Sequence, residues 1–184
     1  MKRFMLLCLA AVLWACDTPH SYGPDTPYYR FPSGSRLVLN RALDIPANWA
    51  TARIQKGRLM AFGHVQEQQP HCIFEVNTVR AEPQRIEPDS FSIVRVERSA
   101  STLAARTGFF LMVGNAFADT DRPGQMFYKT IFMLKSDRQP DVKWLICQSD
   151  QYAAGITIPR HLTVPEIRWA LGDLFTLELP GTQH

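Results

Sequence analysis

Three side chains that could bind a metal or act as acid and base lie close together in the sequence. They are His64, Glu67 and His71, which lie within eight residues, and His71 directly precedes Cys72. Imidazole nitrogens and carboxylate oxygens are common zinc ligands, and both groups serve in hydrolysis. Their spacing is not that of a helical metal motif, and the intervening Gln-Gln-Pro run indicates a hairpin loop. We therefore interpret them as hairpin residues and predict no metal site and no cofactor. His64, Glu67 and His71 are the candidate ligands if the turn brings them together.

Other patterns in the chain point to no catalytic class. Asp119 and Asp121 stand before Arg-Pro-Gly, which is typical of a turn rather than of a calcium loop. No Gly-x-Ser-x-Gly elbow and no glycine-rich phosphate loop occurs. The arginines of the middle third are interpreted as outward-facing strand residues. We predict no catalytic residue from the sequence.

The first sixteen residues have the layout of an export signal. Lys2 and Arg3 precede an apolar run over residues 4–15, which is too short to span a membrane. The run ends in Leu13-Trp14-Ala15-Cys16. These residues resemble the lipobox of bacterial lipoproteins, with Leu at −3, Ala at −1 and Cys at +1. Trp14 departs from the small residue usual at −2.

The resemblance to bacterial lipoproteins implies lipidation of Cys16 and cleavage before it. Residues 1–15 would be the signal peptide, and 16–35, rich in Pro, Ser and Tyr, a lipidated N-terminus and tether. Residues 36–184 would form a single β-rich domain. Such a protein is held in the bacterial cell envelope by its lipid and faces the periplasm, at the inner or the outer membrane. Two or three acyl chains give stable anchoring.

Cys72 and Cys147 are the cysteines left in the exported body. Both lie in apolar runs typical of strands, and an oxidising compartment favours pairing. We expect one disulfide between them, with Cα atoms about 4.4–6.8 Å apart. The alternative is two buried free thiols.

The rest of the chain predicts a mainly β fold. Runs rich in Val, Ile, Phe and Thr alternate with turn signals, whereas the proline-flanked run 81–89 indicates a rigid loop. A change of phase after Ile93 predicts a bulge. The expected strands are 36–40, 51–55, 58–65, 72–79, 91–97, 108–117, 127–135, 142–149 and 174–179. We expect an antiparallel β-sandwich or an open barrel.

One helix is expected near the C-terminus, at about 163–172. Thr163 and Glu166 fit a capping box, with Pro165 in the first turn and Gly172 as the stop. Val164, Ile167 and Leu171 would share one face. This helix would cover an edge or a face of the sheet.

Composition narrows the function without naming it. Without Lys2 and Arg3 the formal net charge of +3 falls to +1, so no basic patch suggests nucleic acid. We expect an envelope lipoprotein used for binding or assembly, with the membrane and an envelope protein as partners. The alternative is a small periplasmic hydrolase with a His/carboxylate site. An apolar, Tyr-bordered groove would favour the binding protein, and a cleft with His64, His71 and a carboxylate the enzyme.

The lipobox yields a direct prediction. Metabolic labelling with an alkyne analogue of palmitate should mark the wild-type chain and not Cys16→Ser, because only the sulfur of Cys16 would carry the first acyl chains. In-gel fluorescence after click coupling measures this, with Cys8→Ser as the matched control that keeps its label. Equal labelling of the wild type and Cys16→Ser would contradict the lipoprotein prediction.

Overall fold

The computed structural model describes residues 22–103, 125–151 and 159–181. Strands dominate this part of the chain, as expected from the sequence. The elements in chain order are β1 (Arg36–Leu39), β2 (Leu43–Ile45), β3 (Thr51–Gln55), β4 (Arg58–Met60), β5 (His71–Val76), β6 (Gln84–Ile86), β7 (Asp89–Leu103), β8 (Gln125–Lys135), β9 (Val142–Gln148), α2 (Val164–Leu171) and β10 (Phe175–Glu178).

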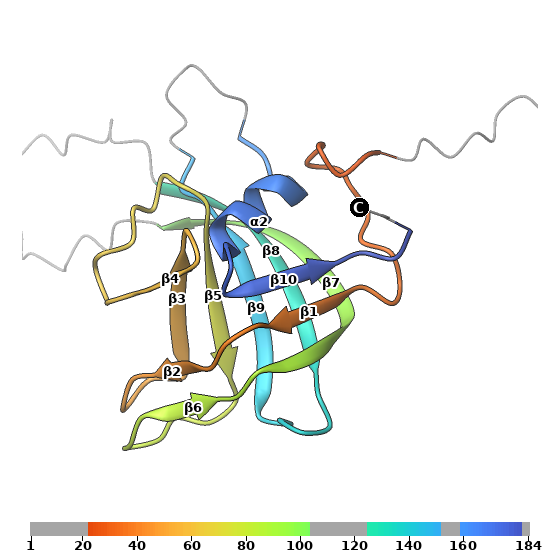
Figure 1. Ribbon diagram of the computed structural model, residues 1–184. Helices are drawn as coiled ribbons and strands as arrows, with labels where there is room; N and C mark the ends of the chain where they lie inside the picture. The colour runs from red at the N-terminus through yellow and green to blue at the C-terminus, as the bar shows by residue number, and fades with distance from the viewer. Residues whose placement is uncertain (1–21, 104–124, 152–158, 182–184) are drawn as a thin grey trace, which may run out of the picture.

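Eight strands form one antiparallel sheet in the order β10-β1-β7-β8-β9-β5-β3-β4. The sheet curls into a half-barrel, and α2 packs against β3, β5 and β10 on its open side (Figure 1). Strands β2 and β6 pair with each other in a small second sheet. The predicted mainly β fold is confirmed, and the large sheet has the form of an open barrel.

The core lies between the concave face of the sheet and α2. Phe74 of β5 stands near its centre, with ring centroids 6.0 Å from Phe91 and 5.5 Å from Phe175. Alternate positions of the strands point inward, as the period of two requires. Each fully buried Phe, Leu or Ile contributes about 1.5–3 kcal/mol. Other buried residues of this core include Leu37, Leu39, Ile54, Val76, Phe132, Leu145, Ile167 and Leu171.

The predicted disulfide between Cys72 and Cys147 is present. The two residues are direct partners across β5 and β9, and both are fully buried. Their Cα atoms are 4.1 Å apart, slightly less than the expected range. This is close to the spacing of a narrow antiparallel pair, about 4.5 Å. The bond closes a sequence separation of 75 residues, a loop for which chain entropy gives about 4 kcal/mol.

Helix α2 begins and ends where the capping signals predict. The Glu166 backbone N–H donates to the Thr163 hydroxyl, and the Glu166 carboxylate accepts the Thr163 N–H at 2.8 Å. At the other end the Gly172 N–H donates to the Arg168 carbonyl at 2.8 Å. The predicted buried face is confirmed and also includes Ala170.

Two sequence expectations need correction, and a third is not tested. The run 58–65 is a strand only to Met60, because the His64 N–H donates to the Ala61 carbonyl and Gly63 has a φ of 79°. Strands β2 and β6 were not expected; each has three residues with a charged one in the middle. Asp44 and Arg85 face each other in that pair, 3.4 Å apart, and such opposite charges stabilise a strand pair. The expected strand 108–117 lies outside the described residues.

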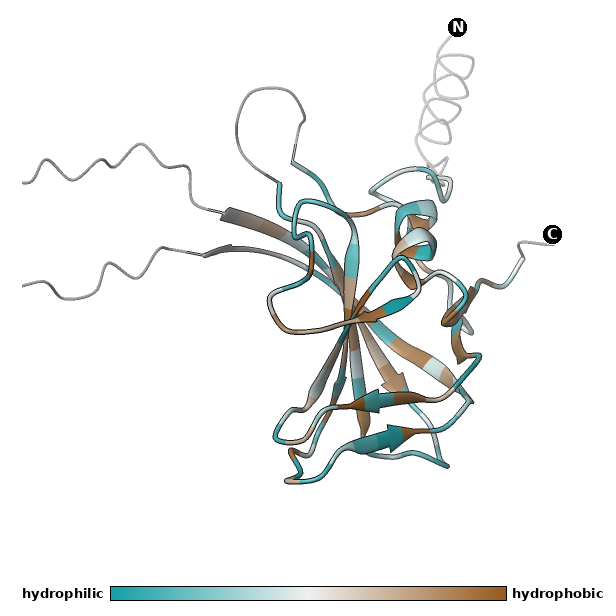
Figure 2. Cartoon of the chain, turned by 60° about the vertical axis from the view of Figure 1, so that its left-hand side comes forward, coloured by the Kyte–Doolittle hydropathy of each residue, from teal (hydrophilic) through white to brown (hydrophobic). Residues whose placement is uncertain are grey.

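Strand β7 extends further than predicted. Its register with β8 shifts between Ile93 and Arg95, which confirms the predicted bulge. Pairing of β7 with β8 continues to Leu103 opposite Gln125, whereas β8 and β9 pair only as far as Thr130 opposite Cys147. The ends of β7 and β8 therefore leave the body together as a two-stranded ribbon (Figure 2).

Part of the predicted tether is packed on the body. The Phe31 ring meets Phe132 edge-on with centroids 4.9 Å apart, and Arg98 donates to the Tyr29 carbonyl at 2.6 Å. The Pro24 carbonyl accepts the Val164 N–H at the start of α2. Because Tyr29 and Phe31 bury apolar surface, the described part of the tether, residues 22–35, belongs to the folded body.

Two glycines allow the β3–β4 turn to touch the end of α2. The Gly57 N–H donates to the Ala170 carbonyl at 3.0 Å. A Cβ atom on Gly172 would lie 2.7 Å from the Gly57 Cα, and Gly172 has a φ of 49° and a ψ of −139°. Both the close approach and the backbone conformation require glycine at position 172.

Gly172→Ala should therefore lower the free energy of unfolding by about 3 kcal/mol, because backbone strain and overpacking each cost about 1–3 kcal/mol. Urea denaturation followed by circular dichroism measures this. Gly181→Ala is the matched control, since Gly181 has a φ of 83° but no atom within 4 Å of the added Cβ. It should show the strain without the clash. An equal loss in the two variants would contradict the packing argument.

Candidate functional site

The candidate ligand residues His64, Glu67 and His71 do not form a common site. His64 is exposed in the loop between β4 and β5, whereas His71, the first residue of β5, is only 1% exposed. Glu67 lies between them and is partly exposed. Within the described ranges, no three His, Cys, Asp or Glu side chains are grouped so that they could hold a metal ion.

Both ring nitrogens of His71 are engaged in hydrogen bonds. Nδ1 lies 3.0 Å from the Gln69 carbonyl, and Nε2 lies 3.2 Å from the side-chain nitrogen of Gln148 on β9. This fits a neutral ring in which Nδ1–H donates to Gln69 and Nε2 accepts from Gln148. Burial lowers the pKa of His71, against the hydrogen bond to the Gln69 carbonyl and the charge of Glu67. His71 thus links the loop to β9, and no nitrogen is left for a ligand.

Asp150 is the buried carboxylate nearest in sequence to this contact. Its backbone N–H donates to the Glu67 carbonyl at 2.6 Å, and its Oδ1 has no hydrogen-bond partner. Among the residues that the structure describes, no hydrogen bond joins His71 to Asp150 or to Glu67. The arrangement therefore lacks the base-to-carboxylate contact from which a hydrolytic pair is built.

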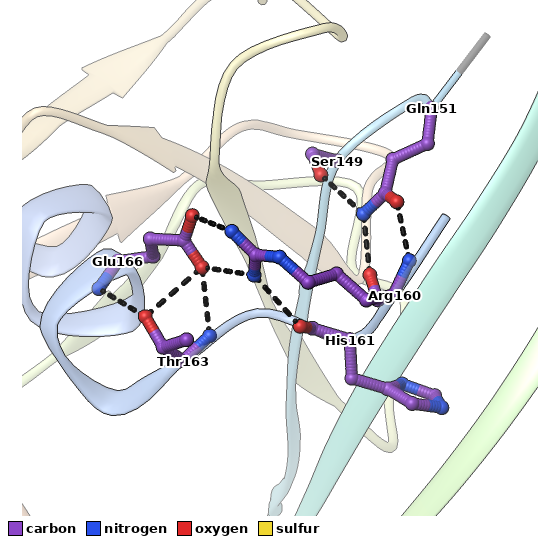
Figure 3. Close-up of polar contacts among 6 residues, drawn as sticks. All are labelled: Ser149, Gln151, Arg160, His161, Thr163 and Glu166. Atoms are coloured by element: carbon purple, nitrogen blue, oxygen red, sulfur yellow. Dashed lines mark hydrogen bonds and ion pairs between the residues drawn. The ribbon is translucent and has the colours of Figure 1, made fainter. Parts of the chain in front are cut away.

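A second polar cluster lies before α2 and is drawn in Figure 3. Arg160 makes two 2.7 Å hydrogen bonds to the Glu166 carboxylate, and Gln151 bonds the Arg160 backbone through both its side-chain atoms. The hydrogen bond from Arg160 lowers the pKa of Glu166 despite its partial burial, and the same bond raises the pKa of Arg160. The charges of Arg160 and Glu166 pair with each other and hold the start of α2 in place.

His161 belongs to the same region but points elsewhere (Figure 3). Its ring meets Tyr128 edge-on, with centroids 5.4 Å apart. Burial and the nearby charge of Arg98 lower its pKa, against a backbone hydrogen bond at Lys129. A neutral ring packed on an aromatic is a structural arrangement, and no carboxylate contacts it within the described residues.

An apolar groove at the free edge of β4 is the strongest candidate for a functional site. Phe62 is 68% exposed, Leu59 44% and Trp49 41%. These three side chains line a surface pocket of about 280 Å³. The remaining lining residues are Asp44, Pro46, Thr51, Ala52, Arg53, Met60 and Ala61. Exposed large apolar side chains gathered around one hollow are typical of a binding site.

Two loops position the aromatic pair of this groove. Trp49 follows β2; its N–H donates to the Pro46 carbonyl at 3.2 Å, and the Gln84 side chain donates to its carbonyl. Phe62 follows β4. The two rings are 5.1 Å apart at an angle of 40°, and the Arg53 guanidinium lies 5.2 Å from the Phe62 centroid. Such contacts contribute about 0.5–1.5 kcal/mol and hold Phe62 at the surface.

Positive charge borders the groove. Arg53 of β3 lines it and has no ion pair with a carboxylate of the described residues, whereas Lys56 and Arg58 of the same hairpin line a separate hollow with His64 and Gln66. Asp44 carries the opposite charge but pairs with Arg85. The groove therefore combines aromatic surface with one cation, Arg53, which lies over Phe62 and has no ion pair with a carboxylate of the described residues.

Sequence reasoning did not single out Trp49 or Phe62. Phe62 was placed within a strand, and Trp49 stood in an unassigned segment. The local signals were the proline three residues before Trp49 and the glycine after Phe62, both typical of loops that expose their neighbours. Only the folded chain brings the two rings together.

Comparison with known proteins found no match: no family model, no curated protein and no solved structure matches this chain. In the described residues no helix is long and apolar enough to cross a membrane.

His71 predicts how stability depends on pH. In the unfolded chain this histidine would take up a proton near its ordinary pKa of 6.5, but the buried ring resists protonation. The unfolded state therefore binds more protons, and the free energy of unfolding should fall as pH drops below 6.5, by up to about 1.4 kcal/mol per pH unit for each such histidine. Asp89 and Glu166, whose pKa values are lowered, add their own loss only below about pH 4.5.

Urea titrations at pH 7.0, 6.0 and 5.0 measure this slope. His71→Gln should reduce it, with the remainder attributable to His161, whose pKa is also lowered. His64→Gln is the matched control, because it makes the same change at an exposed position in the loop between β4 and β5. A slope that is the same in wild type and His71→Gln would show that His71 is not the titrating group.

Proposed function

We propose that this protein is a non-catalytic binding module of the bacterial cell envelope and that the groove around Trp49, Leu59 and Phe62 is its binding site. The observation that carries the proposal is the exposure of these three large apolar side chains around one hollow. Leaving such surface in water is unfavourable, so it is typical of a surface that a partner covers. Trp and Phe are also residue types enriched in protein interfaces.

The N-terminal residues support the location in the envelope. Leu13-Trp14-Ala15-Cys16 resembles a lipobox, and a lipid on Cys16 would hold the body at a membrane. The chain reaches the body soon afterwards, where Tyr29 and Phe31 pack against the sheet. The folded body would therefore stay close to the membrane surface.

The described polar residues favour binding over hydrolysis. His71 has both nitrogens in hydrogen bonds, and Arg160 and Glu166 satisfy each other. Asp150 Oδ1 and His161 Nδ1 have no hydrogen-bond partner, but both atoms are buried away from the surface. A general base needs a free nitrogen or oxygen that reaches the substrate. The groove, by contrast, has an open, aromatic lining and needs no reacting group to act as a binding site.

Site-specific photo-crosslinking in cells tests the proposal. A benzoylphenylalanine at position 62 should give a discrete adduct with an envelope protein, because Phe62 projects from the groove. The same probe at position 94 is the matched control: Val94 is 59% exposed but lies on β7, away from the groove. Immunoblotting of irradiated membranes measures both.

The adduct at position 62 should be lost when Trp49→Ala is added, since that change removes the facing wall of the groove. Circular dichroism of the Trp49→Ala protein would check that it remains folded. No adduct at position 62, or adducts of equal yield at 62 and 94, would contradict the proposed binding site.

A further inference from the structure

The tether enters the body beside a hollow whose charged lining residues are all arginines. Residues 29–34 of the tether and part of β7 line this hollow, which has a volume of about 440 Å³. Arg30, Arg95 and Arg98 belong to the lining, and no Asp or Glu does. Arg95 pairs with Glu97 at 2.9 Å, whereas Arg30 and Arg98 have no ion pair with a carboxylate of the described residues. The hollow therefore carries positive charge that the described residues do not neutralise.

The two unpaired arginines of the hollow are held differently. The Arg98 guanidinium donates to the Tyr29 carbonyl at 2.6 Å, which fixes the tether on β7. Burial lowers the pKa of Arg98, because the charged form loses contact with water, and a nearby anion would offset that cost. Arg30 is exposed, and its side chain has no hydrogen bond within the described residues. One fixed guanidinium and one free guanidinium thus line the same hollow.

A second hollow continues this surface toward the start of β7. It has a volume of about 510 Å³, and the 59% exposed Val94 lines both hollows. Arg36 and Lys135 line the second hollow without an ion pair in the described structure, against one unpaired carboxylate, that of Asp137. The two other charged lining residues pair with each other. Positive charge therefore prevails across both hollows.

The tether also brings two exposed tyrosines to this surface. Tyr22 is 50% and Tyr28 66% exposed, and their ring centroids are 5.6 Å apart. Tyr28 stands two residues before Arg30. Tyrosine is enriched at membrane–water interfaces, because its ring is apolar and its hydroxyl is polar. The six residue steps from Cys16 to Tyr22 span at most about 20 Å, so a lipid on Cys16 would keep Tyr22 within that distance of a membrane surface.

We infer that this surface, the tether face (Tyr22, Tyr28, Arg30 and Arg98), lies against anionic phospholipid headgroups beside the lipid of Cys16. A guanidinium bonds phosphate oxygens through paired N–H donors. Because the anchor keeps the headgroups within reach, their effective concentration at the tether face is high. A lipid chain and a basic patch together attach a protein more firmly than either does alone. The inference rests on the predicted anchor and goes beyond the groove, since it says which side of the body lies on the membrane.

Fluorescence quenching in nanodiscs tests the inference. The full-length chain, purified from bacterial membranes, is placed in discs of phosphatidylcholine or of equal parts phosphatidylcholine and phosphatidylglycerol, each with a trace of nitroxide-headgroup lipid. A coumarin amino acid at position 33 reports on the tether face, because Ser33 is exposed and lines the first hollow. The same probe at position 79 is the matched control. Val79 is 60% exposed and follows β5 outside both hollows, at the lower end of the body in Figure 1, whereas the first tether residues lie at the upper end.

Quenching at position 33 should be stronger in the anionic discs, and quenching at position 79 should be the same in both discs. The difference at position 33 should shrink as sodium chloride is added, because exposed charges are screened. Equal quenching of position 33 in the two discs, or an equal increase at positions 33 and 79, would overturn the inference.

Charge reversal tests whether the arginine hollow causes the contact. Arg30→Glu should lower the ratio of bound to free tether face in anionic discs by at least about fivefold, the effect of one basic residue at an anionic surface. Arg80→Glu is the matched control, since it makes the same change of charge at an exposed position between β5 and β6. Neither side chain has a hydrogen bond or ion pair in the described structure, so both variants should fold, as circular dichroism would verify. Equal ratios in the two variants would contradict the role of the hollow.

The tether face and the groove can fail separately. If position 62 gives no adduct while position 33 is quenched as expected, the proposed binding site fails alone. If a benzoylphenylalanine at position 33 gives a protein adduct while quenching there is equal in the two discs, the tether face binds a protein, and the inference fails alone.

Discussion

The structure depends on covering the concave face of one curled sheet. Seven of its eight strands, all but β4, turn buried apolar side chains to this face, and the sheet remains open between its edge strands β10 and β4. Helix α2 covers part of the opening with Ile167 and Leu171, although a helix of eight residues is unstable alone in water. Its capping box, the Arg160–Glu166 pair and the contact between Gly57 and Gly172 hold it in place. The apolar core and the polar cluster before α2 therefore both hold α2 against the concave face of the sheet.

The position of α2 also determines which apolar surface of the sheet stays exposed. Helix α2 contacts β3, β5 and β10, whereas the apolar groove lies by the end of β4, next to the loop that carries Trp49. On the neighbouring strands β3 and β5, the buried polar side chains already have hydrogen bonds. His71 bonds to Gln148 and Gln69, and Gln55 bonds to the Gln66 backbone. Chemistry that looked available in the sequence is used to fix loops, and the exposed apolar surface lies elsewhere.

The sequence predicted the features that depend on local residue patterns. Thr163 and Glu166 located α2, the change of phase after Ile93 located the bulge, and the apolar runs around Cys72 and Cys147 located the disulfide. It did not predict β2 and β6, because three-residue strands with a charged centre lack a period and form only through mutual pairing. The sequence did not reveal the groove either, because no local pattern links its two aromatic residues. Trp49 and Phe62 belong to separate loops, and their approach depends on the tertiary fold.

The position of β1 between β7 and β10 has a consequence for the order in which the chain can fold. Hairpins such as β3–β4 and β8–β9 form from neighbouring residues, whereas Leu37 must await Phe91 and then Leu177. Non-local pairing of this kind slows folding. A chain synthesised from its N-terminus therefore carries β1 unpaired until β7 has emerged. The concave face stays open until β10 has been synthesised and has paired with β1.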